Sequence, residues 1–264
     1  MSTTVPTLDV SGTPRTPLSR LVSVEFRKAV DTRAGFWFAS SIVGLVLVVL
    51  LIFTLVAPAG NKDFGDLLQV AGGVLGYFLP ILIVMLVTSE QSQRNGLVTF
   101  TLEPKRSRVV VAKFLAGIAL AALVMVLAAL LAALFTGFVA IGGGSPEWAV
   151  EGTLVFNSFI LANLFGIFIG FAISMLLMNT PAGIVVYFIY SLVLPIAVGI
   201  LGGLSSGFHD VAPWIEFNTA QTPLFSGDFR PSAEEWAQIA TSGFVWLVLP
   251  LFLGIQRLLR IEFK

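Results

Sequence analysis

The chain contains six separate apolar runs, each long enough to cross a lipid bilayer as a single helix. They lie near residues 36–57, 67–88, 110–139, 153–178, 182–204 and 237–256. A helix needs about 20 apolar residues to span roughly 30 Å of hydrocarbon. An open strand edge would have no hydrogen-bond partner in lipid, so helices are the expected structure of every run. The sequence therefore predicts an all-α, polytopic membrane protein with six transmembrane helices.

The overall composition agrees with this class of protein. Charged residues make up 11% of the chain, about half the share that is usual in a soluble domain. The chain has no cysteine, which excludes disulfides, thiolate metal sites and cysteine nucleophiles. The formal net charge is zero, and it gives no indication of a nucleic-acid partner. The lipid bilayer is the partner that the composition indicates.

Lys and Arg are distributed unevenly between the segments that connect the apolar runs. If the N-terminus is cytoplasmic, six spans place the C-terminus in the cytoplasm as well. Every Lys and Arg then falls on the cytoplasmic side, except Lys62 and Arg230. Enrichment of these residues in cytoplasmic segments is the general rule for membrane proteins. We therefore predict a multi-pass protein of the plasma (inner) membrane with both termini in the cytoplasm.

The interiors of the six runs contain no Asp, Glu, Lys, Arg or His. Proton-coupled carriers and pumps commonly depend on such groups, so the sequence disfavours proton coupling. Amides and hydroxyls of the runs can form hydrogen bonds between helices. They can also contact a substrate, and sodium coupling through such groups stays open. The candidates for a substrate path are Asn157, Asn163 and Ser174.

Motifs for nucleotide binding and catalysis are missing from the sequence. No G-x-x-x-x-G-K-[ST] loop is present to bind phosphates. His209 is the only histidine, and one histidine cannot form a zinc site by itself. Adjacent carboxylates such as Glu234 and Glu235 are usually just solvated. We therefore assign no catalytic residue and no metal ligand, and we interpret Gly166-x-x-x-Gly170 as a site of close helix packing.

Three segments outside the spans have patterns of their own. Residues 1–17 are rich in Ser, Thr and Pro and are expected to form a disordered tail ahead of one transmembrane domain, 18–264. Apolar residues recur at three- and four-residue spacing from 18 to 30, which predicts an amphipathic helix at the inner headgroup boundary. The outer loop 205–235 carries many aromatic residues, which favour the membrane interface, so we expect short helices there.

The segment 89–108, SEQSQRNGLVTFTLEPKRSR, is the longest charged interruption of the chain. A cytoplasmic connector that holds positive charge for topology would need only Lys and Arg. It would not explain why Phe100 and Leu102 lie next to Glu103, between the breaks at Gly96 and Pro104. Apolar side chains surrounded by charge are typical of a contact with another protein. Both interpretations of the segment are open on this evidence alone.

The chain resembles the permease subunits of type-2 ATP-binding cassette (ABC) transporters. In that family a short cytoplasmic coupling helix joins the second and third spans. Its recurrent pattern is matched here by Glu90, Gly96, Leu102, Pro104, Ser107-Arg108 and Lys113. Residues 24–38, VEFRKAVDTRAGFWF, are similar to the elbow helix of the family, with Glu25, Arg27 and Lys28 in the expected places. Leu97 departs from the pattern, because many members have Thr after the Gly.

This resemblance implies a transport subunit that is not itself an enzyme. A separate nucleotide-binding chain would bind ATP and Mg²⁺ and dock on the coupling helix and the elbow helix. A second permease copy or a paralogue would complete the translocation path. The residues that the resemblance assigns to ATPase docking are Glu90, Arg94, Gly96, Phe100, Leu102, Glu103, Pro104, Arg106 and Arg108.

Two other classes of function stay open at this point. A self-sufficient channel or sodium-coupled secondary carrier would transport without an ATPase partner. An interfacial enzyme would depend on His209, Asp210 or the pair at 234–235. The transported substrate cannot be read from these residues.

Overall fold

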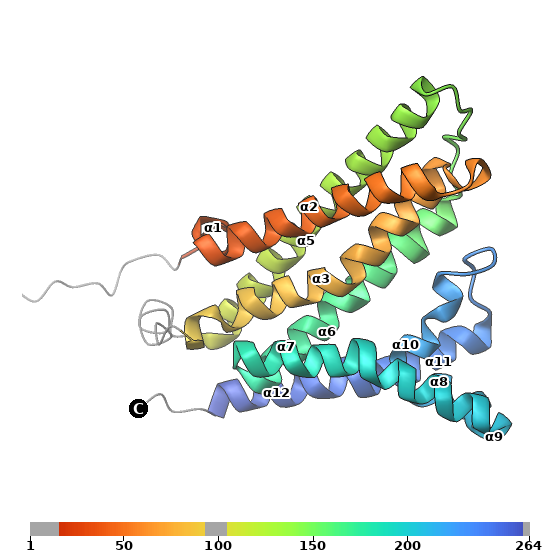
Figure 1. Ribbon diagram of the computed structural model, residues 1–264. Helices are drawn as coiled ribbons and strands as arrows, with labels where there is room; N and C mark the ends of the chain where they lie inside the picture. The colour runs from red at the N-terminus through yellow and green to blue at the C-terminus, as the bar shows by residue number, and fades with distance from the viewer. Residues whose placement is uncertain (1–15, 93–104, 261–264) are drawn as a thin grey trace, which may run out of the picture.

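The computed structural model describes residues 16–92 and 105–260, which form helices and contain no strand. The helices run side by side between two ends of the molecule (Figure 1). In chain order they are α1 (Leu18–Asp31), α2 (Arg33–Val56), η1 (Ala59–Asn61), α3 (Phe64–Ser92), α5 (Arg106–Ile141), η2 (Leu154–Leu161), α6 (Ala162–Leu177), α7 (Thr180–Phe188), η3 (Ile189–Val193), α8 (Leu194–Leu204), α9 (Ser206–Ile215), α10 (Phe217–Ala220), η4 (Thr222–Leu224), α11 (Ala233–Gly243), η5 (Phe244–Val248) and α12 (Leu249–Arg260).

Six helical stretches of the described residues are long and apolar enough to cross a membrane, and they match the six predicted runs. The first three spans are α2, α3 and α5. The other three, η2–α6, α7–η3–α8 and α11–η5–α12, each include a π-helical segment. Short helices α9, α10 and η4 lie between the last two spans, as predicted for the outer loop. The all-α, six-span fold class is confirmed.

Helix α3 is the centre of the molecule. It contacts α2, α5, α6 and α7, and it is the most buried of the spans. Large apolar side chains along its length, such as Leu67, Leu75, Leu79 and Ile83, are almost completely buried. By contrast, α2 and the α7–η3–α8 span lie at the edges and expose most of their apolar surface. The end of α3 leads directly into residues 93–104, so this segment is connected to the core of the fold.

The crossing of α3 and α6 is very close because glycine leaves room for the backbone of the neighbour. A Cβ atom added at Gly170 would lie 2.5 Å from the carbonyl oxygen of Pro80, and one at Gly166 would lie 3.1 Å from the Pro80 side chain. Contacts at such distances exclude any larger residue unless the helices move apart. The predicted role of the Gly166-x-x-x-Gly170 motif in helix packing is confirmed, and its partner is Pro80.

The last span begins at a complete capping box. The Ser232 hydroxyl accepts a hydrogen bond from the backbone N–H of Glu235 at 3.3 Å. The Glu235 carboxylate in return accepts from the backbone N–H of Ser232 at 2.6 Å. These bonds satisfy two N–H groups that would otherwise have no partner at the helix start. Glu235 therefore has a structural role, as a cap of α11.

Replacing Ser232 with Ala is expected to destabilise the start of α11 by about 1 kcal/mol, because the first turn loses its cap. Hydrogen exchange of residues 233–236 should become faster, and the rest of the chain should be unaffected. Ser206→Ala is the matched control, since this serine lies just inside the first turn of α9 while Ser205 provides the cap. Equal exchange rates in the Ser232 variant and the wild type would contradict the capping role.

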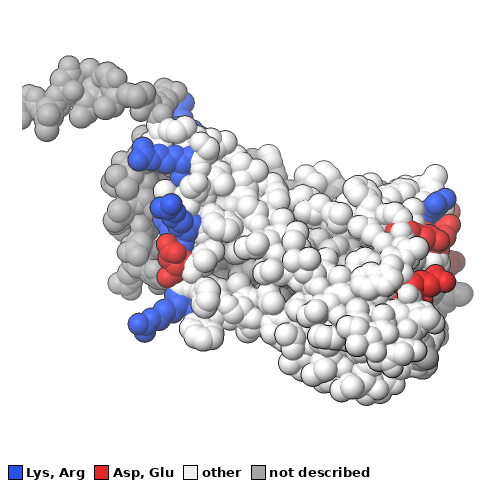
Figure 2. Space-filling model, turned by 90° about the horizontal axis from the view of Figure 1, so that it is seen from above, with Lys and Arg blue, Asp and Glu red and all other residues white. Residues whose placement is uncertain are grey.

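Charged side chains gather at the two opposite ends of the molecule (Figure 2). The basic end consists of α1, the start of α5 and the end of α12, and it carries most of the described Lys and Arg. The acidic end consists of residues 59–66, 142–153 and 205–235, and it carries Asp63, Asp66, Glu147, Glu151, Asp210, Glu216, Asp228, Glu234 and Glu235. The surface between them is uncharged in this view, as the membrane-facing surface of a spanning protein should be.

Candidate functional site

A buried ion pair fastens the amphipathic helix α1 to the third span. The Glu25 carboxylate receives hydrogen bonds from Lys113 Nζ and Lys28 Nζ, each at 2.7 Å. Glu25 and Lys113 are only 6% and 7% exposed, whereas the Lys28 side chain is 41% exposed. Buried charges need a partner, because an unpaired one would lose its hydration without compensation. The pair therefore fixes α1 on α5, about two helical turns after the start of α5.

Arginines at the basic end bind main-chain carbonyls of neighbouring elements. Arg106, at the start of α5, donates from Nη1 to the carbonyl oxygen of Leu258 near the end of α12, at 2.8 Å. Arg257 in turn donates to the carbonyl oxygen of Leu176 at the end of α6, at 2.7 Å. Helix C-termini have unpaired carbonyls that favour cations. These contacts join the start of α5 to the ends of α12 and α6.

Some of the predicted docking residues are described by the structure, and others are not. Arg108 donates to the carbonyl oxygen of Thr16, just before α1. Arg27 is exposed on α1, and Glu90 lies in the last turn of α3. The coupling helix predicted between the second and third spans lies outside the described residues. So do its assigned residues Arg94, Gly96, Phe100, Leu102, Glu103 and Pro104, and the tail that we placed at residues 1–17 is described only from residue 16.

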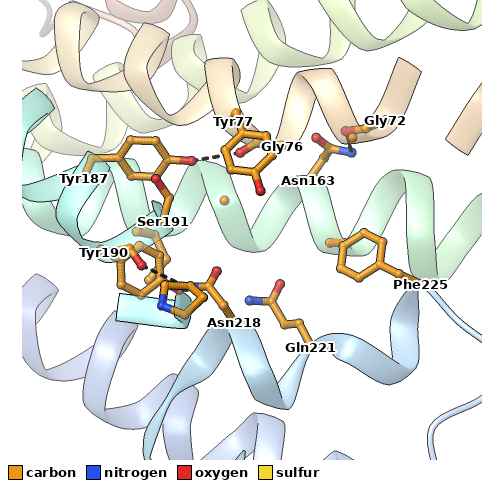
Figure 3. A pocket seen from close by; sticks show the side chains of 15 residues that line it. Gly72, Gly76, Tyr77, Asn163, Tyr187, Tyr190, Ser191, Asn218, Gln221 and Phe225 are labelled. Carbon is orange, nitrogen blue, oxygen red and sulfur yellow. Dashed lines mark hydrogen bonds between the residues drawn. The ribbon is translucent and has the colours of Figure 1, made fainter. Parts of the chain in front are cut away.

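A cavity of about 360 Å³ lies within the membrane-spanning part, toward the acidic end (Figure 3). Helices α3 and α6 form one side of it, and η3, α8 and α10 form the other. Three glycines of α3, at positions 72, 73 and 76, line the cavity. A Cβ atom added at Gly73 would meet no atom within 4 Å. The missing side chains on this face of α3 leave the space open.

A proline explains one polar contact at the edge of the cavity. Pro80 has no N–H group, so the carbonyl of Gly76, four residues earlier, lacks its usual partner within α3. The Tyr187 hydroxyl of α7 donates to this carbonyl at 2.9 Å. The contact joins the second span to the fifth span. It also holds the Tyr187 ring at the cavity wall.

Asn163 of α6 places an amide at the opposite wall (Figure 3). The residue is 2% exposed, and its Nδ2 donates to the carbonyl oxygen of Phe159 at 2.8 Å and lies 3.5 Å from that of Gly72. These two carbonyls identify the nitrogen, because each can only accept. Oδ1 is therefore the free end of the amide, and it has no hydrogen-bond partner among the described residues.

Short helix α10 covers the cavity from the acidic end, and a buried carboxylate holds it in place. Glu216 is 2% exposed and accepts hydrogen bonds from the backbone N–H groups of Asn218, at 2.9 Å, and Thr219, at 2.6 Å. The Asn218 amide donates to both Glu216 Oε1 and the carbonyl oxygen of Tyr190, at 3.0 and 3.1 Å. Asn218 and Gln221 thereby face the cavity from α10 and the residue after it (Figure 3).

The three residues predicted for a substrate path lie in different places. Asn163 lines the cavity, but Asn157 and Ser174 are not among the described residues that do so. Asn157 donates to the carbonyl oxygen of Phe229, and Ser174 donates to that of Gly170 within its own helix. His209 and Asp210 are both exposed at the acidic end, with Nδ1 and Oδ1 3.6 Å apart.

Several residues of the cavity were not singled out from the sequence. They are Tyr77, Tyr187, Tyr190, Asn218 and Gln221. The tyrosines could have been noticed, because all three tyrosines of the chain lie within predicted spans. Pro80 four residues after Gly76 was also a readable signal of a free carbonyl. Nothing in the local sequence of residues 218–221 indicates that they turn toward the spans.

Comparison with known proteins identifies a family that the chain matches. A family model described as ABC-2 family transporter protein matches residues 104–263, which is more than half of the chain. The match covers the last four spans, the acidic-end helices and the end of residues 89–108. A search of curated proteins finds no match to the chain.

Proposed function

Because this chain belongs to the ABC-2 family of transporter proteins, it is a membrane permease of an ABC transporter, and we propose that it forms the translocation path of an ATP-driven exporter. The family match over residues 104–263 carries this proposal. ATP and Mg²⁺ would be bound by a separate nucleotide-binding chain, since no phosphate-binding loop is present in the sequence. A second permease copy or a paralogue would complete the path.

The separation of charge supports a definite orientation. The basic end would face the cytoplasm and the acidic end the outside, because Lys and Arg accumulate on the cytoplasmic side of membrane proteins (Figure 2). Residues 93–104 would then lie in the cytoplasm, where an ATPase chain could reach them. This orientation would also place both termini in the cytoplasm, and we propose the plasma (inner) membrane as the location of the protein.

The contacts at the basic end support a route for mechanical coupling. Residues 93–104 connect the end of α3, the central helix, to the start of α5. Arg106 joins this start to α12, and the pair of Lys113 with Glu25 joins it to α1. A displacement of the 93–104 segment by a docked ATPase would therefore move several spans together. Phe100 and Leu102 would supply the apolar contacts, and Glu90, Arg94, Glu103, Arg106 and Arg108 the polar ones.

Replacing Phe100 with Asp tests this docking. Purification of the full chain from native membranes should recover a nucleotide-binding chain with the wild type. The variant should recover about tenfold less of it, because loss of an apolar hot spot typically costs at least about 1.4 kcal/mol of binding free energy. Ile141→Asp is the matched control, since Ile141 is 85% exposed at the end of α5 nearest the acidic end. Unchanged recovery in the Phe100 variant would overturn the docking role.

Reconstitution of the purified chain separates this function from a self-sufficient carrier or channel. In vesicles without an ATPase chain, the permease should be inert under a sodium gradient or a membrane potential. Gradient-driven uptake by the chain alone would contradict the proposal. The interiors of its predicted spans contain no Asp, Glu, Lys, Arg or His for proton coupling, so the sodium gradient is the decisive condition.

A further inference from the structure

The cavity beneath α10 has a specific chemical character. Its described lining contains no Asp, Glu, Lys, Arg or His. Four aromatic rings line it, and they belong to Tyr77, Tyr187, Tyr190 and Phe225. Aromatic faces carry partial negative charge and attract cations. With about 360 Å³, the cavity has the size of a small-molecule site and is far larger than a metal ion needs.

Three buried polar atoms of the lining residues have no hydrogen-bond partner in the described part of the chain. They are Asn163 Oδ1, the Tyr190 hydroxyl and the Ser191 hydroxyl, on residues that are 2%, 5% and 9% exposed. Buried polar groups are nearly always hydrogen-bonded, so these three indicate a missing ligand. Asn163 Oδ1 can only accept, because its amide nitrogen already faces two carbonyls. The ligand must therefore bring a hydrogen-bond donor.

A buried negative charge lies immediately behind this wall. The oxygens of Glu216 face four donor groups, which is the environment of an ionised carboxylate. Within residues 16–92 and 105–260, no Lys or Arg forms an ion pair with it. Asn218 contacts Glu216 and lines the cavity, so the charge is one side chain away from the ligand. In a region of low dielectric constant, such a charge favours a cation and disfavours an anion.

We propose that this cavity binds a small organic cation that carries N–H donors, namely a primary or secondary ammonium attached to an apolar group. The ammonium would donate to Asn163 Oδ1 and lie near the aromatic rings, with Glu216 balancing its charge. The apolar group would pack on the glycine face of α3 and on Ile169. If the chain exports a substrate as proposed above, this class of amine is the substrate class; binding itself does not rest on that function.

Equilibrium binding to the full chain in lipid nanodiscs tests the proposal, with empty nanodiscs as the blank. Three probes of similar size differ in charge: 2-phenylethylamine, 2-phenylethanol and phenylacetate. The amine should bind tightest and phenylacetate weakest. In Glu216→Gln the affinity for the amine should fall about tenfold while that for the alcohol stays the same, because only the amine is charged. Asn163→Leu should weaken the amine by a similar factor, because its acceptor is lost.

Ser174→Ala is the control on α6, because Ser174 is buried on the same helix but does not line the cavity. If Glu216→Gln does not fold, Tyr190→Phe keeps the ring and removes only the hydroxyl, and it should still weaken the amine. Equal affinity for amine and alcohol would overturn the proposal, and so would an unchanged amine affinity in Asn163→Leu. The assay contains no ATP and no ATPase, so its result is independent of the Phe100 experiment.

Discussion

Gly170→Val is expected to prevent the correct assembly of the bundle. Even the first carbon of the new side chain would lie 2.5 Å from the Pro80 carbonyl oxygen and 2.9 Å from Pro80 Cα. Both are backbone atoms of the central helix, so no side chain can turn away to relieve the contact. Forced overpacking typically costs about 1 to 3 kcal/mol, and a clash with backbone atoms is expected to reach the upper end of that range. The melting temperature in detergent and the monodisperse fraction in size-exclusion chromatography should both fall strongly.

Gly199→Val is the control for the general effect of valine in an apolar helix. Gly199 lies on the exposed face of α8, where an added Cβ would meet no atom within 4 Å. This variant should retain the wild-type melting temperature within about 1 °C, because surface substitutions rarely change stability by more than about 0.5 kcal/mol. Equal stability of the two variants would show that α3 and α6 do not cross through Gly170.

Lys113→Met is expected to release α1 from the third span. The substitution leaves the Glu25 carboxylate buried, with only the more exposed Lys28 as its partner. Removing one member of a buried pair typically costs about 3 kcal/mol or more. Limited proteolysis should therefore cleave residues 18–32 faster, and the midpoint of thermal unfolding should fall. Under the proposed function, ATP-dependent transport should also be lost.

Two further variants test whether Lys113→Met loses stability because the Glu25 charge is left buried or because packing is lost. Lys28→Met removes the exposed partner of Glu25 and should cost at most about 1 kcal/mol, as exposed ion pairs do. The double variant Glu25→Leu with Lys113→Met removes both buried charges and should recover most of the stability, since apolar replacement of a buried pair is often neutral. If the double variant is as unstable as Lys113→Met alone, the charge explanation is wrong.

The six spans were predictable because each depends on a run of neighbouring residues. Hydrophobic thickness sets the length of a span, and that length can be counted along the chain. The close packing at Gly166 and Gly170 was predictable for the same reason, since the two residues are one helical turn apart. Their partner Pro80 was not, because it lies some 90 residues earlier in the chain and no local pattern links the two positions.

Individual site residues were less predictable than the spans. Glu25 was predicted as part of an elbow helix, and α1 is present at that position, but the side chain lies buried against Lys113, 88 residues away. Asn163 was chosen as one polar residue among several in the spans. Only the convergence with Tyr190, Asn218 and Gln221 distinguishes it from Asn157, which donates to a loop carbonyl.

The sequence determined some features and the tertiary structure determined others, because the interactions behind them join residues at different distances along the chain. Span number, helical structure and the separation of charge between the two ends depend on hydropathy and charge along short stretches, so the printed sequence alone sufficed for them. The buried ion pair, the glycine crossing and the cavity beneath α10 each need residues from helices far apart in the chain. These features form only after α3, α5, α6 and α10 have packed, because packing buries the polar groups and burial makes their choice of hydrogen-bond partner energetically important.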